Sequence, residues 1–515
     1  MRYGFVIDQR KCIGCHACTV ACKEENQVPL GVNRTWVKYI EKGTFPDTRR
    51  YFSVMRCNHC DNAPCVTICP TVALYRRPDG IVDFDGDRCI GCKSCMQACP
   101  YDALYIDPET QTAAKCHYCA HRIEVGLEPA CVIVCPVQAI VPGDLDDPGS
   151  PIARLVAGQQ TAVRKPEQGT QPKLFYLGAD EAALTPGMQE RGNGYLFAEG
   201  SAIPVPGGSN IARTSAPVGN DGIDLLRMAR TVYDVAHPER AWGWKVSTYL
   251  WTKSIAAGAL LVAAIATIGG LSAAGPVAGI AAPAISLILL ALTTALLVLD
   301  LKRPERFLYL LFKPNWRSWL VWGGWILMAH GFLAALWLIA GWRQSAGTLL
   351  VLAWPALLVA AGSAGYSAFL FGQAEGRDFW QSPLVLPHLF VAAATAGCAS
   401  LLLAVIFFIG DLRVAQGLAG ALWLLLVASA LVLLAETLTT HASHDAARAA
   451  RLITRGPYRA RFWWGVVVGG TIVPVLLLMS PFYPATPVAA SILALGGLWL
   501  WEDLWVRAGQ ALPLS

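Results

Sequence analysis

Long apolar runs dominate the second half of this 515-residue chain. From Trp242 onward, successive stretches of about 20 residues carry few charges, and each is long enough to cross a bilayer as a helix. A soluble helical core could hold one or two such runs, but not a whole series. We therefore predict an all-α integral membrane bundle of eight transmembrane helices within 241–515. The predicted spans are 247–271, 279–300, 316–341, 346–371, 384–410, 414–440, 463–480 and 486–508.

The first half has a different pattern, with short apolar segments between charged residues and cysteines. Residues 1–188 are predicted to form one domain, in which the insert 24–56 forms a pair of strands. Residues 189–240 are rich in Gly, Pro, Ser and Asn, as in Ile203-Pro-Val-Pro-Gly-Gly-Ser-Asn210, and show little periodicity. This composition predicts a linker between the two domains.

Sixteen of the 17 cysteines lie in the first domain, in four groups of four. The third group, with Pro100 after its last cysteine, matches the bacterial ferredoxin run C-x2-C-x2-C-x3-C-P. Three thiolates of such a run can bind one cubane, and the fourth binds a neighbouring cluster. Four groups therefore predict four [4Fe–4S] clusters in an α+β ferredoxin-like domain. The groups are Cys12, Cys15, Cys18, Cys22; Cys57, Cys60, Cys65, Cys69; Cys89, Cys92, Cys95, Cys99; and Cys116, Cys119, Cys131, Cys135.

Zinc ligands and disulfides are weaker interpretations of these cysteines. Zinc sites also use Cys-x2-Cys pairs, but without the x3-Cys-Pro ending. A disulfide framework suits a short secreted domain, whereas thiolates that bind clusters need a reducing compartment for assembly. One group departs from the pattern, because Lys23 and not proline follows Cys22. That difference changes a turn and not a ligand.

Charge limits the possible partners and indicates an orientation. The net charge is +5, and no basic stripe with interleaved aromatic residues points to nucleic acid. The N-terminus from Met1 to Arg10 has no apolar signal core or twin arginine, so no export address is expected. An even number of spans returns the bundle to the side on which it begins, here called the near side. Near-side loops carry twelve Lys or Arg residues and far-side loops two, which favours a cytoplasmic iron–sulfur domain and a bacterial or archaeal cytoplasmic membrane. The alternative is a periplasmic domain that is exported with the signal of a partner protein.

Ionisable side chains inside predicted spans are costly and usually functional. A quinone site needs hydrogen-bond partners for two oxygens and a route for protons. The candidates are Asp300, Arg306, Tyr249, Lys253 and Glu436, all toward the near side. Lys253 could instead extend to the interface. His330 is interpreted as a buried histidine bonded to a neighbouring carbonyl, with a proton path as the alternative. No two histidines lie deep in two spans, so no haem is expected.

Residues 1–188 resemble the four-cluster electron-transfer subunits of molybdopterin oxidoreductases, the DmsB/PsrB type. The most specific features are the stretch from Cys57 to Cys65, which reads CNHCDNAPC, and the eleven-residue gap before Cys131. The resemblance implies four ligand sets, which we number I to IV. They are set I, Cys12, Cys15, Cys18 and Cys135; set II, Cys116, Cys119, Cys131 and Cys22; set III, Cys57, Cys60, Cys65 and Cys99; and set IV, Cys89, Cys92, Cys95 and Cys69.

Residues 242–508 resemble the NrfD/PsrC family of eight-helix, quinone-reactive membrane subunits. The resemblance lies in Trp242-Gly-Trp-Lys-Val-Ser-Thr-Tyr-Leu-Trp251, Asp300-Leu-Lys-Arg-Pro-Glu-Arg306 and Lys313-Pro-Asn-Trp-Arg-Ser-Trp319. Two subunits that are usually separate chains are thus expected to be fused here.

The two resemblances imply the electron-transfer and membrane-anchor subunit of a respiratory oxidoreductase complex. Its partners would be a catalytic subunit with a molybdenum or tungsten pterin and the menaquinone or ubiquinone pool. Neither a pterin site nor a substrate site is expected in this chain, so the partner's substrate stays open. Alternatives are the equivalent subunit of a nickel–iron hydrogenase, a redox-driven proton translocator and a plain anchor without quinone chemistry.

Overall fold

The computed structural model describes the chain except residues 45, 189, 192–228, 236–240, 271–274 and 481–482. The chain divides into two compact units, Met1–Ala241 with Pro513–Ser515, and Trp242–Leu512. Each unit is described by itself.

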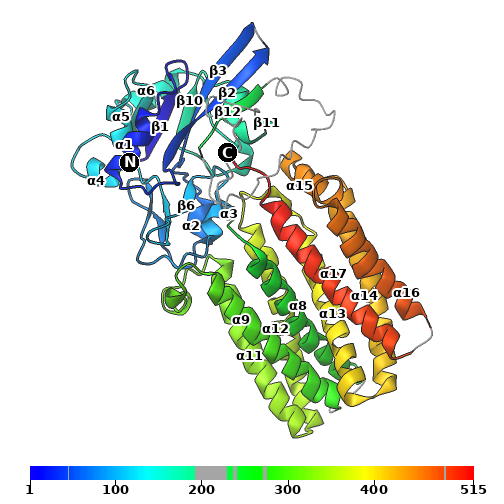
Figure 1. The fold of residues 1–515 in the computed structure, drawn as a ribbon. Coiled ribbons are helices and arrows are strands. Elements are labelled where there is room, and N and C mark those ends of the chain that lie inside the picture. The colour runs from blue at the N-terminus through cyan, green and yellow to red at the C-terminus, as the bar shows by residue number, and fades with distance from the viewer. Residues whose placement is uncertain (45, 189, 192–228, 236–240, 271–274, 481–482) are drawn as a thin grey trace. The chain divides into compact units, whose positions relative to one another are not determined.

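The first unit contains two four-stranded sheets and two small hairpins (Figure 1). One sheet has the order β8-β1-β10-β9, with β1 parallel to β10 and antiparallel to β8. Its central strand β1 is a nearly continuous apolar run, and Phe5, Val6 and Ile7 are buried, as expected for a strand covered on both faces. The strands are β1 Tyr3–Asp8, β8 Ile140–Asp144, β9 Thr161–Ala162 and β10 Leu174–Leu177.

The second sheet contains the strand pair predicted for the insert 24–56, which is confirmed. Strands β2, Thr35–Thr44, and β3, Asp47–Arg56, form a long antiparallel hairpin. Strand β12, Ala229–Tyr233, extends this sheet along β2, and β11, Glu190–Arg191, pairs with β12. The two small hairpins are β4 Leu74–Arg76 with β5 Val82–Phe84, and β6 Leu104–Ile106 with β7 Ala113–Lys115.

The prediction of a linker over 189–240 is wrong for two short segments, β11 and β12. Ala229-Arg-Thr-Val-Tyr233 alternates buried or half-buried side chains with an exposed one, which is a strand pattern that the surrounding Gly/Pro composition obscured. The rest of the predicted linker, 192–228 and 236–240, lies outside the described residues.

Short helices follow the cysteine loops. They are α1 Ala17–Glu25, α2 Pro64–Ile68, α3 Ser94–Ala98, α4 Ala120–Ile123 and α5 Ala130–Ile133. Helix α6, Pro151–Gly158, packs on the first sheet, and α7, Glu181–Leu184, lies against the second.

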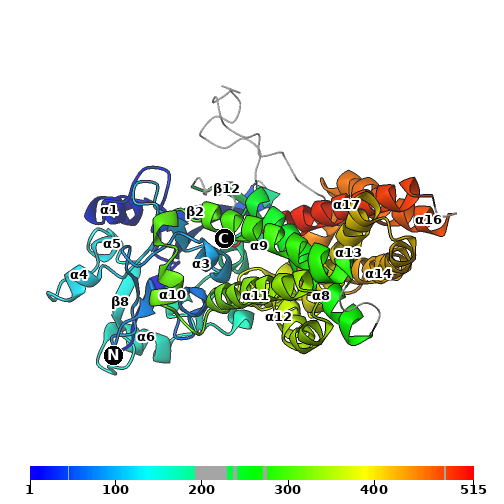
Figure 2. The ribbon, with the colours of Figure 1, turned by 90° about the horizontal axis from the view of Figure 1, so that it is seen from below.

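The second unit is a helical bundle with eight helices long and apolar enough to cross a membrane among the described residues, which confirms the predicted number (Figures 1 and 2). The spans run over Trp244–Ile268 (α8), Val277–Asp300 (ending in α9), Trp319–Trp342 (α11), Ala346–Gly372 (α12), Val385–Ile409 (beginning with α13), Leu412–Leu438 (α14), Arg461–Met479 (ending in α16) and Ala485–Gly509 (α17). Two short helices, α10 Tyr309–Phe312 and α15 His444–Thr454, lie in connections.

Helices α8 and α13 form the centre of the bundle. Their apolar windows are 72% and 67% buried, against 39% or less for the other spans. Glycines allow the two helices to approach closely, because a Cβ added at Gly258 would lie 1.8 Å from the carbonyl oxygen of Ala393. Small residues at crossings are the usual means of helix association in membranes, where the lipid is as apolar as the side chains.

Candidate functional site

The cysteine loops of the first unit need unusual backbone conformations. His16 and Lys93, each directly after the second cysteine of its group, have positive φ values of 61° and 65° and immediately precede α1 and α3. Cys119 precedes α4 with a φ of 50°. Non-glycine residues rarely adopt this region, and such strain concentrates at functional sites. In the third group, the loop with this turn brings Cys89, Cys92 and Cys95 to the wall of one cavity.

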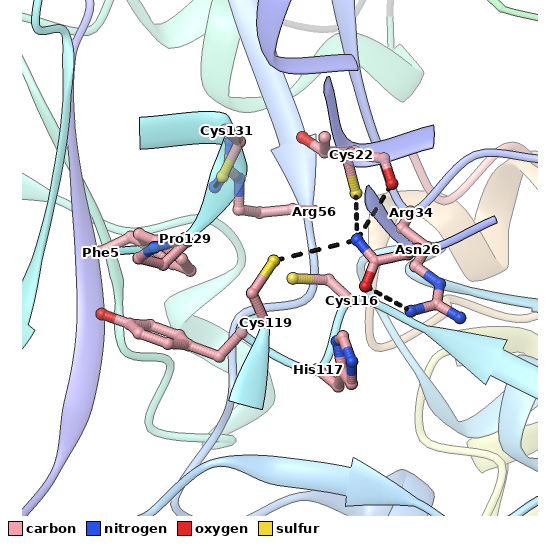
Figure 3. Close-up of a pocket in the computed structure, with 12 residues that line it drawn as sticks. Phe5, Cys22, Asn26, Arg34, Arg56, Cys116, His117, Cys119, Pro129 and Cys131 are labelled. Carbon is pink, nitrogen blue, oxygen red and sulfur yellow. Dashed lines mark hydrogen bonds between the residues drawn. The ribbon is translucent and has the colours of Figure 1, made fainter. Parts of the chain in front are cut away.

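Set II lines a cavity of the first unit (Figure 3). Its four cysteines come from separate segments, since Cys22 lies on α1, Cys131 on α5, and Cys116 and Cys119 in the loop before α4. Burial, and then the neighbouring Cys116, Cys131 and Cys119, raise the pKa of the Cys22 thiol. Set IV likewise lines a second cavity with all four of its cysteines.

The remaining two sets are brought together in the same way. Burial, followed by Cys135 and Cys15, raises the pKa of Cys12, and burial is the main cause that raises the pKa of Cys18 to about 11. In set III, burial and then Cys99 and Cys57 raise the pKa of Cys65. Cys12, Cys18 and Cys65 thus each have neighbours from their own implied set.

The donor sets fit iron–sulfur clusters. Buried thiolates that repel one another need positive charge between them, and a coordinating metal keeps a thiol deprotonated. Backbone N–H groups also point at the sulfurs: Ala113 donates to Cys89 at 3.3 Å, and Ala139 donates to Cys135 at 3.2 Å. Hydrogen bonds of this kind tune Fe–S clusters.

The sets differ in their exposure. Cys15 of set I is exposed, and Cys12 and Cys135 of the same set are half-buried. All cysteines of sets II and III are buried, and in set IV only Cys92 is half-buried. Set I is thus the group that lies nearest the surface of the unit.

In the membrane bundle, two of the predicted quinone residues lie on α8. Lys253 is completely buried, and its Nζ donates to the hydroxyl of Ser367 at 2.7 Å and to the carbonyl of Ala364 at 3.1 Å. The same Nζ lies 4.8 Å from the ring centroid of Tyr366. Lys253 therefore points into the bundle against α12, and the alternative that it extends to the interface is wrong. Tyr249, one turn earlier, is also buried.

Glu436 of α14 is part of a buried cluster that the sequence analysis missed. Its Oε2 lies 2.9 Å from Nδ1 of His388 on α13, and Oε1 of Glu502 on α17 lies 3.8 Å from Nε2 of the same imidazole. The indole of Trp501 donates to His388 at 3.2 Å. We call His388, Glu436 and Glu502 the imidazole–carboxylate cluster. The sequence analysis did not select His388 and Glu502, because both lie near the ends of apolar runs. Polar residues at such positions are usually ordinary residues of the membrane–water interface.

Glu502 also connects this cluster to α8, because it is an electrostatic neighbour of both Tyr249 and Lys253. Asp300, the half-buried last residue of α9, is another electrostatic neighbour of Tyr249. Arg306 is half-buried in the turn Pro304–Arg306 that follows α9. The structure therefore places Glu502 3.8 Å from the imidazole of His388 and within electrostatic range of Tyr249 and Lys253.

His330 is buried on α11, as interpreted, but its partners differ from the expected carbonyl. Its two ring nitrogens each lie 2.8 Å from a serine hydroxyl, Ser286 on α9 and Ser363 on α12. The imidazole links three helices.

Comparison with known proteins agrees with this division. Residues 48–145 match the model of a 4Fe-4S dicluster domain, residues 10–26 a 4Fe-4S binding domain, and residues 235–512 the family "Polysulphide reductase, NrfD".

Similar proteins match the first part of the chain. It is 49% identical over 191 residues to the B subunit of tetrathionate reductase from Salmonella typhimurium, covering 36% of this chain and 76% of that protein. It is 47% identical over 178 residues to the protein NrfC of Escherichia coli, covering 34% and 80%. It is 37% identical over 227 residues to ArrB, the iron–sulfur subunit of the arsenate respiratory reductase of a Shewanella species, covering 34% and 96%.

The NrfD match covers more than half of the chain, and the relatives of the first part are covered over most of their length. The chain is a multi-pass membrane protein that carries [4Fe–4S] clusters. It therefore belongs to the NrfD family of polysulphide reductase membrane subunits, with an electron-transfer iron–sulfur subunit fused to its N-terminal side.

Proposed function

We propose that this chain transfers electrons between a catalytic subunit with a molybdenum or tungsten pterin and the membrane quinone pool, through four [4Fe–4S] clusters. The observation that carries the proposal is the presence, in one chain, of four complete cysteine sets and an NrfD bundle with buried ionisable residues. Relatives of the first part are named as subunits of tetrathionate and arsenate reductases, which favours a reductase complex over a hydrogenase.

Cysteines of different sets that are electrostatic neighbours support a serial electron path. Each cluster, when bound, takes up and passes on one electron at a time. Cys18 of set I neighbours Cys131 of set II, Cys116 of set II neighbours Cys57 of set III, and Cys95 of set IV neighbours Cys65 of set III. These neighbours give the order I–II–III–IV.

We propose that set I lies at the end of this path where the catalytic partner binds. Cys15 is exposed, and the apolar side chains of Ile13, Val20 and Ile133, near set I cysteines in the sequence, are each more than half exposed. Exposed apolar residues around a redox site are typical of a protein–protein interface. The partner would bind over this surface.

At the other end of the electron path, we assign quinone chemistry to the membrane bundle. Reduction of a quinone to a quinol consumes two electrons and two protons. Lys253 and Tyr249 can donate hydrogen bonds to the quinone oxygens, with Asp300 and Arg306 at the near-side entrance. The imidazole–carboxylate cluster can hold and deliver protons, because the imidazole of His388 lies 2.9 Å from the carboxylate of Glu436, a distance over which a proton can pass. The excess of basic residues in near-side loops favours a cytoplasmic iron–sulfur domain.

The test is metal analysis of the complex purified gently from membranes through a tag on this chain. Molybdenum or tungsten near one per complex, with sixteen or more irons expected from the sixteen cysteines, supports the proposal. Nickel in place of molybdenum or tungsten would contradict it and indicate a hydrogenase. Iron well below this value in an intact complex would contradict the four clusters.

A further inference from the structure

Arg56, the last residue of β3, is a buried cation at the wall of the set II cavity. Its side chain is 1% exposed, and its guanidinium lies 4.7 Å from the ring centroid of Phe5. Its Nη1 donates to Sγ of Cys131 at 3.2 Å (Figure 3). Arginine remains charged in proteins, so a positive charge is fixed beside one of the four sulfurs.

The other donors of Arg56 have no protein partner. Among the described residues, nothing accepts a hydrogen bond from Nε or Nη2, and no Asp or Glu forms an ion pair with the guanidinium. Buried charges and donors are nearly always satisfied, and an exception at a cavity wall calls for an acceptor in the cavity. The sulfur atoms of a bound cluster are acceptors of the right kind.

A second arginine lines the same cavity, and two of its nitrogens donate to protein acceptors. Nη1 of Arg34 donates to Oδ1 of Asn26 at 3.2 Å and Nε to the hydroxyl of Tyr105 at 3.3 Å, and the guanidinium lies over the ring of Phe84. Both arginines supply positive charge to the cavity, but Arg56 has two buried donor nitrogens, Nε and Nη2, without a protein acceptor among the described residues.

We propose that Arg56 raises the reduction potential of the cluster held by set II, by donating hydrogen bonds to its sulfurs and by placing a positive charge beside it. Reduction adds one negative charge to the cluster without breaking a bond. A nearby cation and N–H donors stabilise the reduced form more than the oxidised form, and hydrogen bonds to the sulfurs are an established control of such potentials. Cys18 of set I is also a neighbour of Arg56, so a smaller effect is expected on set I.

The test is a potentiometric titration of the purified complex, followed by electron paramagnetic resonance of the reduced clusters. Arg56→Met removes the charge and the donors but keeps a flexible, unbranched apolar stem. We expect one cluster signal to titrate at a lower potential, with the equilibrium constant for its reduction at least tenfold smaller, which is about 59 mV for a one-electron couple. Arg34→Met should give a smaller shift. Arg50→Met, an exposed arginine on the same strand that pairs with Glu41 at 2.5 Å, should give none.

Unchanged potentials in Arg56→Met with full iron content would overturn the proposal, as would an equal shift in Arg50→Met. If the methionine variant loses iron, Arg56→Lys decides, because the compact ammonium keeps the positive charge but cannot place its N–H groups in the planar fork of the guanidinium. A lowered potential in that variant supports the proposal, and unchanged potentials overturn donation by the guanidinium to the sulfurs. The inference rests on the cluster of set II and not on the catalytic partner, so a complex without molybdenum or tungsten would refute the proposed function and leave this test intact.

Discussion

Replacing Glu436 by glutamine should separate the quinone reaction from electron transfer through the clusters. The carboxylate of Glu436 is 5% exposed and lies 2.9 Å from the imidazole of His388, and its Oε1 accepts no hydrogen bond from the described residues. Glutamine keeps the size and one accepting oxygen but removes the negative charge. The change therefore affects the proton and the charge more than the packing.

The magnitude follows from the contact with His388. Two unit charges about 4 Å apart attract by about 4 kcal/mol at an effective dielectric constant of about 20. Loss of a group that transfers protons typically lowers a rate by about 10²- to 10⁴-fold. We expect quinol-dependent turnover to fall about 100-fold, which corresponds to about 2.7 kcal/mol in the activation free energy.

The assay compares two activities of the purified complex. Turnover with a soluble quinol analogue should fall, whereas dye-linked electron transfer, which bypasses the bundle, should stay within about twofold of the parent. Glu375→Gln, at a half-buried carboxylate in the loop after α12, is the matched control and should change neither activity. Unchanged quinol turnover in Glu436→Gln, with normal thermal stability, would refute the assignment of the imidazole–carboxylate cluster to the quinone reaction.

Three further predictions address other parts of the molecule. Gly258→Ala should destabilise the bundle by about 1–3 kcal/mol, because its Cβ would overlap the backbone of α13. The control Gly420→Ala on α14 should not destabilise it, because no atom lies within 4 Å of the added Cβ. The midpoint of thermal aggregation in detergent measures the stability of the two variants, and equal midpoints would contradict the close crossing of α8 and α13. Cys95→Ser should remove one cluster's iron and Cys398→Ser none, as iron analysis would show; full iron in Cys95→Ser would argue against set IV. Lys253→Met should raise KM for the quinol analogue and leave dye-linked activity unchanged, and the assignment fails if KM is unaltered.

The sequence alone determined the features that depend on neighbouring positions along the chain. Apolar length predicted all eight spans, with ends within a few residues of those observed, because a helix that crosses a bilayer must be about 20 residues long. The spacing of the cysteines predicted cluster binding, because a cubane needs several thiolates from one tight loop. The strand pair of the insert 24–56 likewise depends on residues that are close together in the sequence. Composition misled only where short strands such as Ala229–Tyr233 lie in a Gly/Pro-rich segment.

Only the tertiary structure decided which distant residues meet. His388, Glu436 and Glu502 come from three helices, and no pattern within one helix indicates that their side chains converge. Lys253 could extend to the interface or point inward, and packing of α8 against α12 decides for the second. Arg56 resembles many arginines that end a strand until the fold surrounds its guanidinium with Phe5 and the set II thiols. Burial and electrostatic contacts depend on distances through space, and these are fixed only when the helices and sheets pack.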